Sequence, residues 1–294
     1  MPADMSAVGR GGNPDGPWDH PGAGVAQAVV TTSGHGGPSR KLSLTHVSKT
    51  YGSGVAAVRA VDDVTIEVEV GEFICVVGPS GCGKTTVLRM IADLEPLTEG
   101  EITIAHHDPT RALTTVIFQE DSILPWMSVR KNVSFGPRMR HVPKSGYRDL
   151  VEELIAKVGL TKFADALPHQ LSGGMKQRVS IARAFANDPE ILLMDEPFAA
   201  LDEQNRLILQ EELLRIWGET KKTVVFITHS IDEAVFLSDR VVVMSARPGR
   251  IMADIKVPFD RPRTLHELRV DPAFGALTGR IWRLLRDEVR KAEA

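Results

Sequence analysis

The glycine-rich stretch that begins at Gly78 and ends at Thr85, Gly-Pro-Ser-Gly-Cys-Gly-Lys-Thr, has the composition of a loop that binds phosphate. Its glycines allow backbone N–H groups to curl around phosphates, and the N-terminus of a following helix favours an anion. Lys84 is expected to reach the β- and γ-phosphates of a nucleotide, and the Thr85 hydroxyl to bind Mg²⁺. The stretch lies between the apolar run 73–77 and a helical pattern at 86–94, the context that this motif requires.

Two adjacent carboxylates, Asp195 and Glu196, end a second apolar run that starts at residue 191. Neighbouring side chains on a strand point to opposite sides, so the two carboxylates cannot share one role. Asp195 suits the second coordination sphere of Mg²⁺, whereas Glu196 is free to polarise the attacking water. No Asn-Lys-x-Asp motif, which reads guanine, follows the phosphate loop, and this favours ATP over GTP as the nucleotide.

A third motif, Leu-Ser-Gly-Gly-Met-Lys-Gln at residues 171–177, distinguishes the chain from other phosphate-loop proteins. Ser172 can cap the helix that follows, and Gly173 and Gly174 let the backbone approach a ligand closely. With the three motifs in this order, the sequence resembles the ATP-binding cassette (ABC) ATPases. The resemblance implies that these three residues hold the γ-phosphate of an ATP bound to the Lys84 loop of a second copy, in a head-to-tail dimer around two ATP molecules.

Four further residues resemble functional positions of the family, although a lone histidine or tyrosine would otherwise be read as structural. Gln119 resembles the Q-loop glutamine that senses Mg²⁺ and water, and His229 the switch histidine that contacts the γ-phosphate. Asp202 resembles the D-loop residue that crosses the dimer interface, and Tyr51 the aromatic on which adenine stacks. The residues expected at the nucleotide are Tyr51, Gly78, Pro79, Ser80, Gly81, Cys82, Gly83, Lys84, Thr85, Thr86, Ser172, Gly173, Gly174 and Asp202; those expected in the chemistry are Glu196, His229, Gln119 and Lys84; those expected at Mg²⁺ are Thr85, Gln119 and Asp195.

The elements that must position these residues are those of an α/β protein. Apolar β runs alternate with helical patterns, which implies a largely parallel sheet covered on both faces. The resemblance implies more: a P-loop NTPase (RecA-like) core with an antiparallel β subdomain and a helical insertion, the ABC ATPase architecture. The β runs lie at residues 42–47, 64–70, 73–77, 114–118, 191–194, 223–227 and 241–244.

The chain is expected to have three parts. Residues 1–40 are rich in Gly, Pro, Ser and Ala without apolar periodicity, and they predict a disordered leader. Residues 41–260 form the predicted ABC ATPase domain, whose helical subdomain covers about residues 120–187. Residues 261–294 carry apolar residues at helical spacing and predict a C-terminal helical segment.

Composition excludes several classes of protein. The 294 residues are 43% hydrophobic, enough for one large domain, and their net charge of −3 argues against a nucleic-acid-binding protein. The cysteines Cys75 and Cys82 lie in an apolar run and in the phosphate loop, so they predict no disulfide framework and fit a reducing cytoplasm. No run approaches the roughly 18 apolar residues of a transmembrane helix, so the chain is not expected to cross a membrane by itself.

Residues 118–126 and 238–250 resemble the branch of the family that imports nitrate, sulfonates and taurine. The chain departs from the family at Asp93, where glycine is usual, but this position lies beyond the turn that contacts phosphate. The resemblance implies the ATP-hydrolysing subunit of an importer for a small anionic solute, peripheral on the cytoplasmic face of the inner membrane. It implies three kinds of partner: a second copy, two integral membrane permease subunits and an extracytoplasmic solute-binding protein.

Other functions stay open at this point. A soluble ABC ATPase that acts on ribosomes or DNA usually has two cassettes, large insertions or basic arms, whereas this chain has one cassette and no basic tail. The ATPase of another ABC transporter branch, such as an exporter, is a further alternative. The apolar residues 123–127 follow Gln119 directly, where transporter ATPases meet a coupling helix, but they would also suit packing inside the helical subdomain. The solute cannot be read from this chain, because its pocket lies in other subunits.

Overall fold

The computed structural model describes residues 29–31, 40–119 and 122–293. The strands are β1 (Val29–Thr31), β2 (Arg40–Tyr51), β3 (Val58–Glu69), β4 (Phe73–Val77), β5 (Glu99–Ala105), β6 (Ala112–Ile117), β7 (Pro189–Asp195), β8 (Thr223–Thr228), β9 (Arg240–Met244) and β10 (Ile251–Lys256). The helices are α1 (Lys84–Ile91), α2 (Val129–Val133), α3 (Phe135–Met139), α4 (Arg148–Lys157), α5 (Gly173–Ala186), α6 (Glu203–Thr220), α7 (Ile231–Leu237), α8 (Leu265–Val270) and α9 (Pro272–Glu293).

The centre of the fold is a six-stranded sheet in the order β10-β9-β4-β8-β7-β6, in which only the edge strand β10 runs antiparallel. Its inner strands are buried on both faces, which explains why they read as continuous apolar runs. Along β4, Phe73, Cys75 and Val77 pack into one hydrophobic cluster with α5, α6, α7 and α9, while Ile74 and Val76 pack into a second. The expected α/β fold is confirmed.

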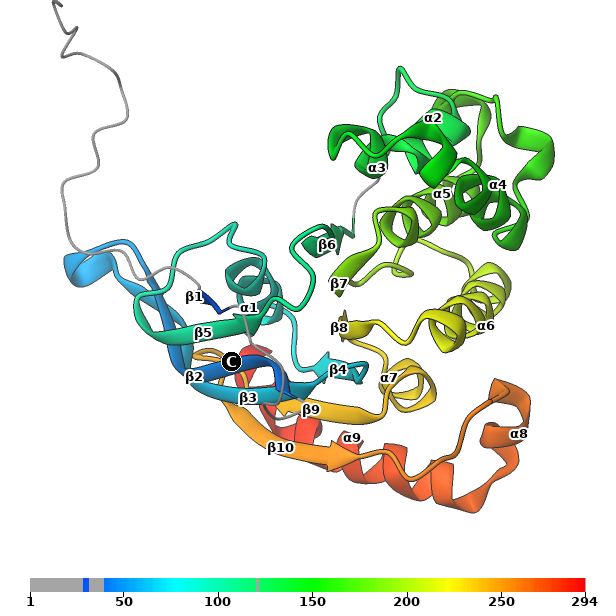
Figure 1. Cartoon of the computed structure of the whole chain (residues 1–294). Helices are drawn as coiled ribbons and strands as arrows, with labels where there is room; N and C mark the ends of the chain where they lie inside the picture. The colour runs from blue at the N-terminus through cyan, green and yellow to red at the C-terminus, as the bar shows by residue number, and fades with distance from the viewer. Residues whose placement is uncertain (1–28, 32–39, 120–121, 294) are drawn as a thin grey trace, which may run out of the picture.

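A four-stranded sheet, in the order β1-β5-β2-β3, covers the other face of the central sheet. Helix α1 lies between the two sheets (Figure 1), where Val87 and Leu88 share a cluster with Leu42 of β2 and Ile102 of β5. The pairs β2–β3 and β2–β5 are antiparallel, as the resemblance implies. This arrangement holds the phosphate loop and the first turn of α1 at one end of the sandwich.

The expected disordered leader, residues 1–40, lies mostly outside the described residues. Where the structure describes it, the chain is strand rather than disorder: Val29–Thr31 pairs in parallel with β5, and Arg40 begins β2. Three consecutive β-branched residues favour an extended backbone, and the free edge of β5 offers it hydrogen-bonding partners. The prediction of disorder is therefore corrected for these residues.

The helical insertion leaves the central sheet after β6 and returns to it at β7, which pairs directly with β6. Figure 1 shows α2, α3 and α4 beyond these two strands, on the side away from the second sheet. Helix α5 leads back to β7 and contributes buried residues, including Val179 and Ala182, to the larger cluster. At the other end of the chain, α8 and α9 occupy the segment where the sequence predicts helix. Within the described part of the chain, no helix has the length and apolarity needed to span a bilayer.

A buried ion pair fastens the second sheet to the start of β7. Glu190 of β7 pairs with Lys41 of β2, and their side chains are 4% and 2% exposed. The Glu190 carboxylate also accepts the backbone N–H groups of His107 at 3.1 Å and Asp108 at 2.6 Å. Burial pushes the pKa of Glu190 upward, but the hydrogen bonds from Lys41 and the two amides outweigh it and leave the pKa below its ordinary value. The carboxylate is thus held in its charged form.

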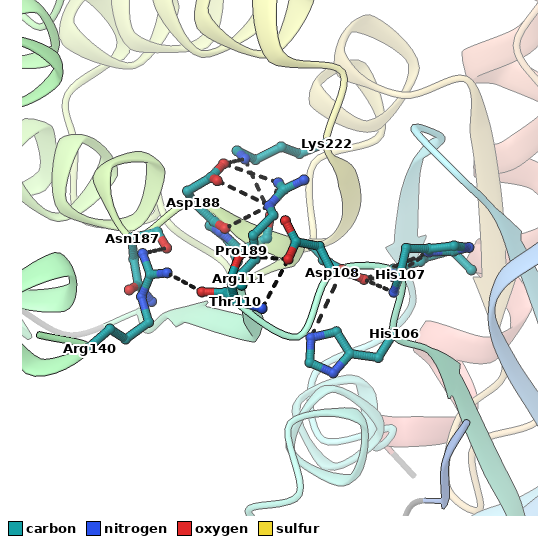
Figure 2. A network of polar contacts seen from close by, with 12 residues as sticks. His106, His107, Asp108, Thr110, Arg111, Arg140, Asn187, Asp188, Pro189 and Lys222 are labelled. Atoms are coloured by element: carbon teal, nitrogen blue, oxygen red, sulfur yellow. Dashed lines mark hydrogen bonds and ion pairs between the residues drawn. The ribbon is translucent and has the colours of Figure 1, made fainter. Parts of the chain in front are cut away.

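A wider polar network surrounds this pair and joins it to the helical insertion (Figure 2). Arg140, which follows α3, donates to the carbonyl oxygens of Thr110 at 2.9 Å and Asn187 at 2.7 Å. Asp188 forms ion pairs with Arg111 and Lys222, the latter just before β8. Segments from the second sheet, the insertion and the central sheet therefore converge at the N-terminal end of β7.

We expect Glu190→Gln to lower the free energy of unfolding by about 3 kcal/mol, because it leaves the buried Lys41 ammonium without its counter-charge. The measurement is urea denaturation of the full chain. Glu67→Gln is the matched control: its pair with Arg40 is roughly half exposed, with side chains 53% and 49% accessible, so the loss should stay below about 1 kcal/mol. Equal stability of the two variants would contradict the importance assigned to the buried pair.

Candidate active site

The phosphate loop connects β4 to α1, and its glycines are required by both conformation and space. Gly83 has φ 105°, a left-handed conformation, and a Cβ at this position would lie 2.8 Å from the carbonyl oxygen of Ala60. A Cβ on Gly78 would lie 2.8 Å from Sγ of Cys82. The Cys82 side chain points into the core, where burial raises its pKa, so it packs the loop from beneath and is not a reactive thiol.

A cavity of about 480 Å³ opens over this loop. It gathers half of the residues that the sequence predicts at the nucleotide, from β2, the phosphate loop and α1, together with Gln119 and Glu196, which follow β6 and β7. Val58, Ala60 and Arg247 also line it, and sequence reasoning missed all three. The full lining is Tyr51, Val58, Ala60, Ser80, Gly81, Gly83, Lys84, Thr85, Thr86, Gln119, Glu196 and Arg247.

Lys84 lies at the base of the cavity, with a buried side chain. Its Nζ donates to the carbonyl oxygens of Gly78 at 2.9 Å and Pro79 at 3.0 Å. These contacts hold a positive charge inside the curve of the loop, where backbone N–H groups and the N-terminus of α1 also favour an anion. The loop is therefore built to receive phosphate.

The Thr85 hydroxyl joins the phosphate loop to the acidic strand by donating to Oδ1 of Asp195 at 3.0 Å. Burial raises the pKa of Asp195, and the neighbouring Glu196 raises it further, while the Thr85 hydrogen bond lowers it.

Gln119 lines the same cavity. Residues 29–31, 40–119 and 122–293 contain no cluster of three or more His, Cys, Asp or Glu side chains that could cage a metal. A hydroxyl, an amide and a carboxylate beside a phosphate loop do fit Mg²⁺, which takes oxygen ligands and is commonly held with substrate phosphates.

Glu196 and His229 form a pair at the carboxyl ends of the neighbouring parallel strands β7 and β8. The distance from Nδ1 of His229 to Oε2 of Glu196 is 2.9 Å. Glu196 has φ 44°, rare for a residue other than glycine, and its N–H donates to the Ile227 carbonyl at 3.0 Å. Its carboxylate lines the cavity and is 20% exposed, whereas the His229 side chain is 59% exposed and only reaches the cavity through Glu196. A carboxylate held this way beside a phosphate site can polarise water.

Tyr51 is the last residue of β2 and also lines the cavity. Its ring is partly exposed. Its hydroxyl lies 3.5 Å from Oγ1 of Thr86, and Nζ of Lys49 lies 4.9 Å from the ring centroid. An exposed aromatic ring at the wall of a phosphate-binding cavity offers a flat surface to a nucleotide base.

Four of the predicted residues lie at the starts of α5 and α6, outside this cavity. Ser172 caps α5 by accepting the Met175 N–H at 3.3 Å, and a Cβ on Gly173 would meet nothing within 4 Å. Gly174 follows in the first turn of α5. Asp202 caps α6 by accepting the Asn205 N–H at 2.9 Å, and hydrogen bonds with Asn205 lower its pKa. These residues are presented on the surface, away from the phosphate loop of their own chain.

Comparison with known proteins agrees with this geometry. The family model described as ABC transporter matches residues 61–199. An uncharacterized ABC transporter ATP-binding protein of Methanocaldococcus jannaschii is 49% identical over 254 residues, which cover 86% of this chain and 94% of that protein. The taurine import ATP-binding protein of Jannaschia sp. is 41% identical over 247 residues, covering 81% and 92%. The nitrate import ATP-binding protein of Synechococcus elongatus is 44% identical over 239 residues, covering 79% and 86%.

Solved structures give the same result for the fold. A dimeric ATP-binding cassette in a post-hydrolysis state, bound to ADP and Pi, superposes with a TM-score of 0.64 at 32% identity and covers 74% of this chain and 100% of that one. Two of the three sequence motifs meet at the cavity, and the matches cover most of each relative's length. The chain therefore belongs to the ABC transporter family, as one of its ATP-binding, ATP-hydrolysing subunits.

Proposed function

We propose that this chain energises the import of a small anionic solute, of the taurine, aliphatic sulfonate or nitrate type, through partner membrane subunits. The observation that carries the proposal is the identity of 41% and 44% with proteins named for taurine and nitrate import, over 92% and 86% of their lengths. In this proposal the chain lies on the cytoplasmic face of the inner membrane. It works with two permease subunits and an extracytoplasmic solute-binding protein.

ATP binds in the cavity with adenine against Tyr51 and its phosphates in the loop, beside Lys84. Thr85, Gln119 and Asp195 are the residues that would hold Mg²⁺, which would offset the negative charge of the phosphates. Glu196 accepts a hydrogen bond from the attacking water and polarises it toward the γ-phosphate. Nδ1 of His229 lies 2.9 Å from Oε2 of Glu196, and this contact supports the proposed role of His229 as the switch histidine.

The surface position of Ser172, Gly173 and Gly174 supports a site completed by a second copy. These residues form an exposed helix N-terminus with open space around Gly173, yet they do not line the cavity of their own chain. Two copies arranged head to tail bring each such N-terminus to the γ-phosphate in the other copy's loop. The structural relative bound to ADP and Pi is itself dimeric.

The segment after Gln119 supports contact with a membrane subunit. Ile123 is buried in the main cluster, whereas Pro125 is exposed and Trp126 is 70% exposed. The two readings of this segment therefore apply to different residues: Ile123 packs the fold, and Trp126 remains available to a partner.

The direct test is uptake of radiolabelled taurine, alkanesulfonate and nitrate by cells that lack this chain, with the gene restored as the control. We expect uptake of one of these anions to be lost, and the chain to sediment with membranes only when its permease is present. Unchanged uptake of all three anions, together with a chain that never sediments with membranes, would overturn the proposal in favour of the soluble class.

For the chemistry, Glu196→Gln keeps the size of the side chain but removes the charge that polarises water. Hydrolysis should fall by roughly 10²–10⁴-fold while ATP binding persists. Phosphate release and ATP affinity measured on the same preparation separate the two effects. Glu203→Gln, which changes an exposed carboxylate outside the cavity, should leave turnover unchanged. Near-normal turnover of the Glu196 variant would remove that residue from its assigned role.

For the composite site, Ser172→Arg should abolish hydrolysis and leave the nucleotide affinity of the isolated chain unchanged, because Ser172 lies outside its own cavity. Mixing this variant with Lys84→Ala chains should give heterodimers with one intact composite site and a partial return of activity. Fluorescent-nucleotide titration of the monomer supplies the control. If the monomer of the Ser172 variant loses ATP, the loop acts within its own chain.

For docking, Trp126→Ala should spare the ATPase activity of the free chain and weaken its association with the permease roughly 30-fold, as expected for about 2 kcal/mol at an interface anchor. Binding to permease in detergent gives the affinity, and thermal unfolding gives the stability. Trp282→Ala removes another exposed tryptophan, on α9, and should change neither. An unstable Trp126 variant that still assembles normally would show that Trp126 packs the fold.

A further inference from the structure

The loop that joins β9 to β10, residues 245–250, packs directly on the phosphate loop. A Cβ on Gly249 would lie only 2.1 Å from the carbonyl oxygen of Cys82, so the two backbones touch. The Gly249 N–H donates to the Ala60 carbonyl at 3.0 Å, and its own carbonyl accepts the Asp62 N–H at 3.0 Å. This β9–β10 loop is therefore fixed in place by the same strand, β3, that packs against Gly83.

Arg247 extends from this loop into the wall of the ATP cavity. Its Nη2 and Nε donate to the carbonyl oxygen of Gly81 at 3.2 and 3.4 Å. In the described part of the chain, no carboxylate lies within ion-pair distance of Arg247, which is otherwise exposed. A guanidinium carries five N–H donors, so one carbonyl oxygen leaves several of them, and the full charge, available to a ligand in the cavity.

Arg250 in the same loop is different. Its Nε donates to Oδ2 of Asp62 at 2.7 Å, so its charge is already neutralised. Arg250 lines a second cavity, of about 710 Å³, on the outer side of the phosphate loop, and it does not line the ATP cavity. Arg247, Ser80 and Gly81 line both cavities and separate them. The two arginines are thus a natural pair for comparison.

The C-terminal helix holds the β9–β10 loop next to Arg247. Glu288 of α9 is buried, and its Oε2 accepts the N–H of Ala246, the residue before Arg247, at 2.9 Å. Figure 1 shows α9 alongside β9 and β10. A residue near the end of the chain therefore sets the backbone from which Arg247 reaches the site.

We propose that Arg247 binds the phosphates of ATP and ADP, and that α9 positions it through Glu288. The proposal rests on the assignment of the cavity to ATP, and it adds a ligand contact from outside the three family motifs. Arginine suits this place because its planar fork donates two parallel hydrogen bonds to phosphate oxygens. Its contact with Gly81 directs it toward the middle of the phosphate loop.

The test is isothermal titration of the full-length chain with ATP, ADP and adenosine. Arg247→Ala should weaken ATP and ADP binding about tenfold and leave adenosine binding unchanged, because the lost group is one charge-assisted contact to phosphate. Arg247→Lys should restore part of the affinity. Arg250→Ala should leave all three affinities as in the unchanged chain, even where it lowers the thermal midpoint through loss of the pair with Asp62.

The role of α9 has its own variants. Glu288→Ala should reproduce the phosphate-selective loss more weakly, while Asp287→Ala, its exposed neighbour, should have no effect. The proposal is overturned if Arg247→Ala binds ADP with the affinity of the unchanged chain. It is also overturned if Arg250→Ala loses as much ADP affinity as Arg247→Ala, or if Arg247→Ala loses as much affinity for adenosine as for ADP. Wild-type ADP affinity in Glu288→Ala overturns the part assigned to α9. These binding data do not depend on which solute is imported, so failure here is distinguishable from failure of the import proposal.

Discussion

The hydrogen bond between Thr85 and Asp195 links the two halves of the candidate active site and sets the distance between them. One half is the phosphate loop after β4, and the other is the acidic end of β7. The two strands are not neighbours, because β8 lies between them, and the parallel register aligns Val77 with Thr228 and Asp195 with Ile227. All three strands therefore end at one edge of the sheet, where loop, acid pair and His229 meet.

Strand β7 shows how the rest of the fold holds the carboxyl ends of these strands in position. Its carboxyl end carries Asp195 and Glu196, while its first residues carry the buried Glu190 pair and the network around Asp188. A strand that is buried along its whole length and fastened at its start has little freedom to slide or tilt. The unusual backbone conformation of Glu196 is held by this surrounding structure, as strained residues at functional sites commonly are.

The parts that could be predicted from sequence are those determined by interactions between residues that are close together in the chain. Gly78 and Gly83, Lys84 and the Asp195–Glu196 pair each depend on a few adjacent residues and on a strand that is plainly apolar. Strands β5 and β10 were missed because each offers only a short apolar signal: in β5 only Ile102 and Ile104 are buried, and in β10 only Ile255. Arg247 could not have been found in this way, since its place depends on a hairpin that folds back over a loop more than a hundred residues earlier. Tyr51 and His229 were found through family resemblance, and no local pattern would have distinguished them from structural residues.

The outward position of Ser172 and Gly173 makes the activity of the proposed dimer depend on protein concentration. In that proposal each chain contributes two half-sites, since Ser172, Gly173 and Gly174 do not line the cavity of their own chain. In dilute solution, the number of complete sites then grows with the square of the protein concentration, so a purified chain becomes less active per molecule as it is diluted. Two copies anchored to one permease complex experience a high and constant effective concentration instead. In the proposed complex, anchoring turns a collision between molecules into a motion within one assembly, and ATP consumption is then confined to the place where transport occurs.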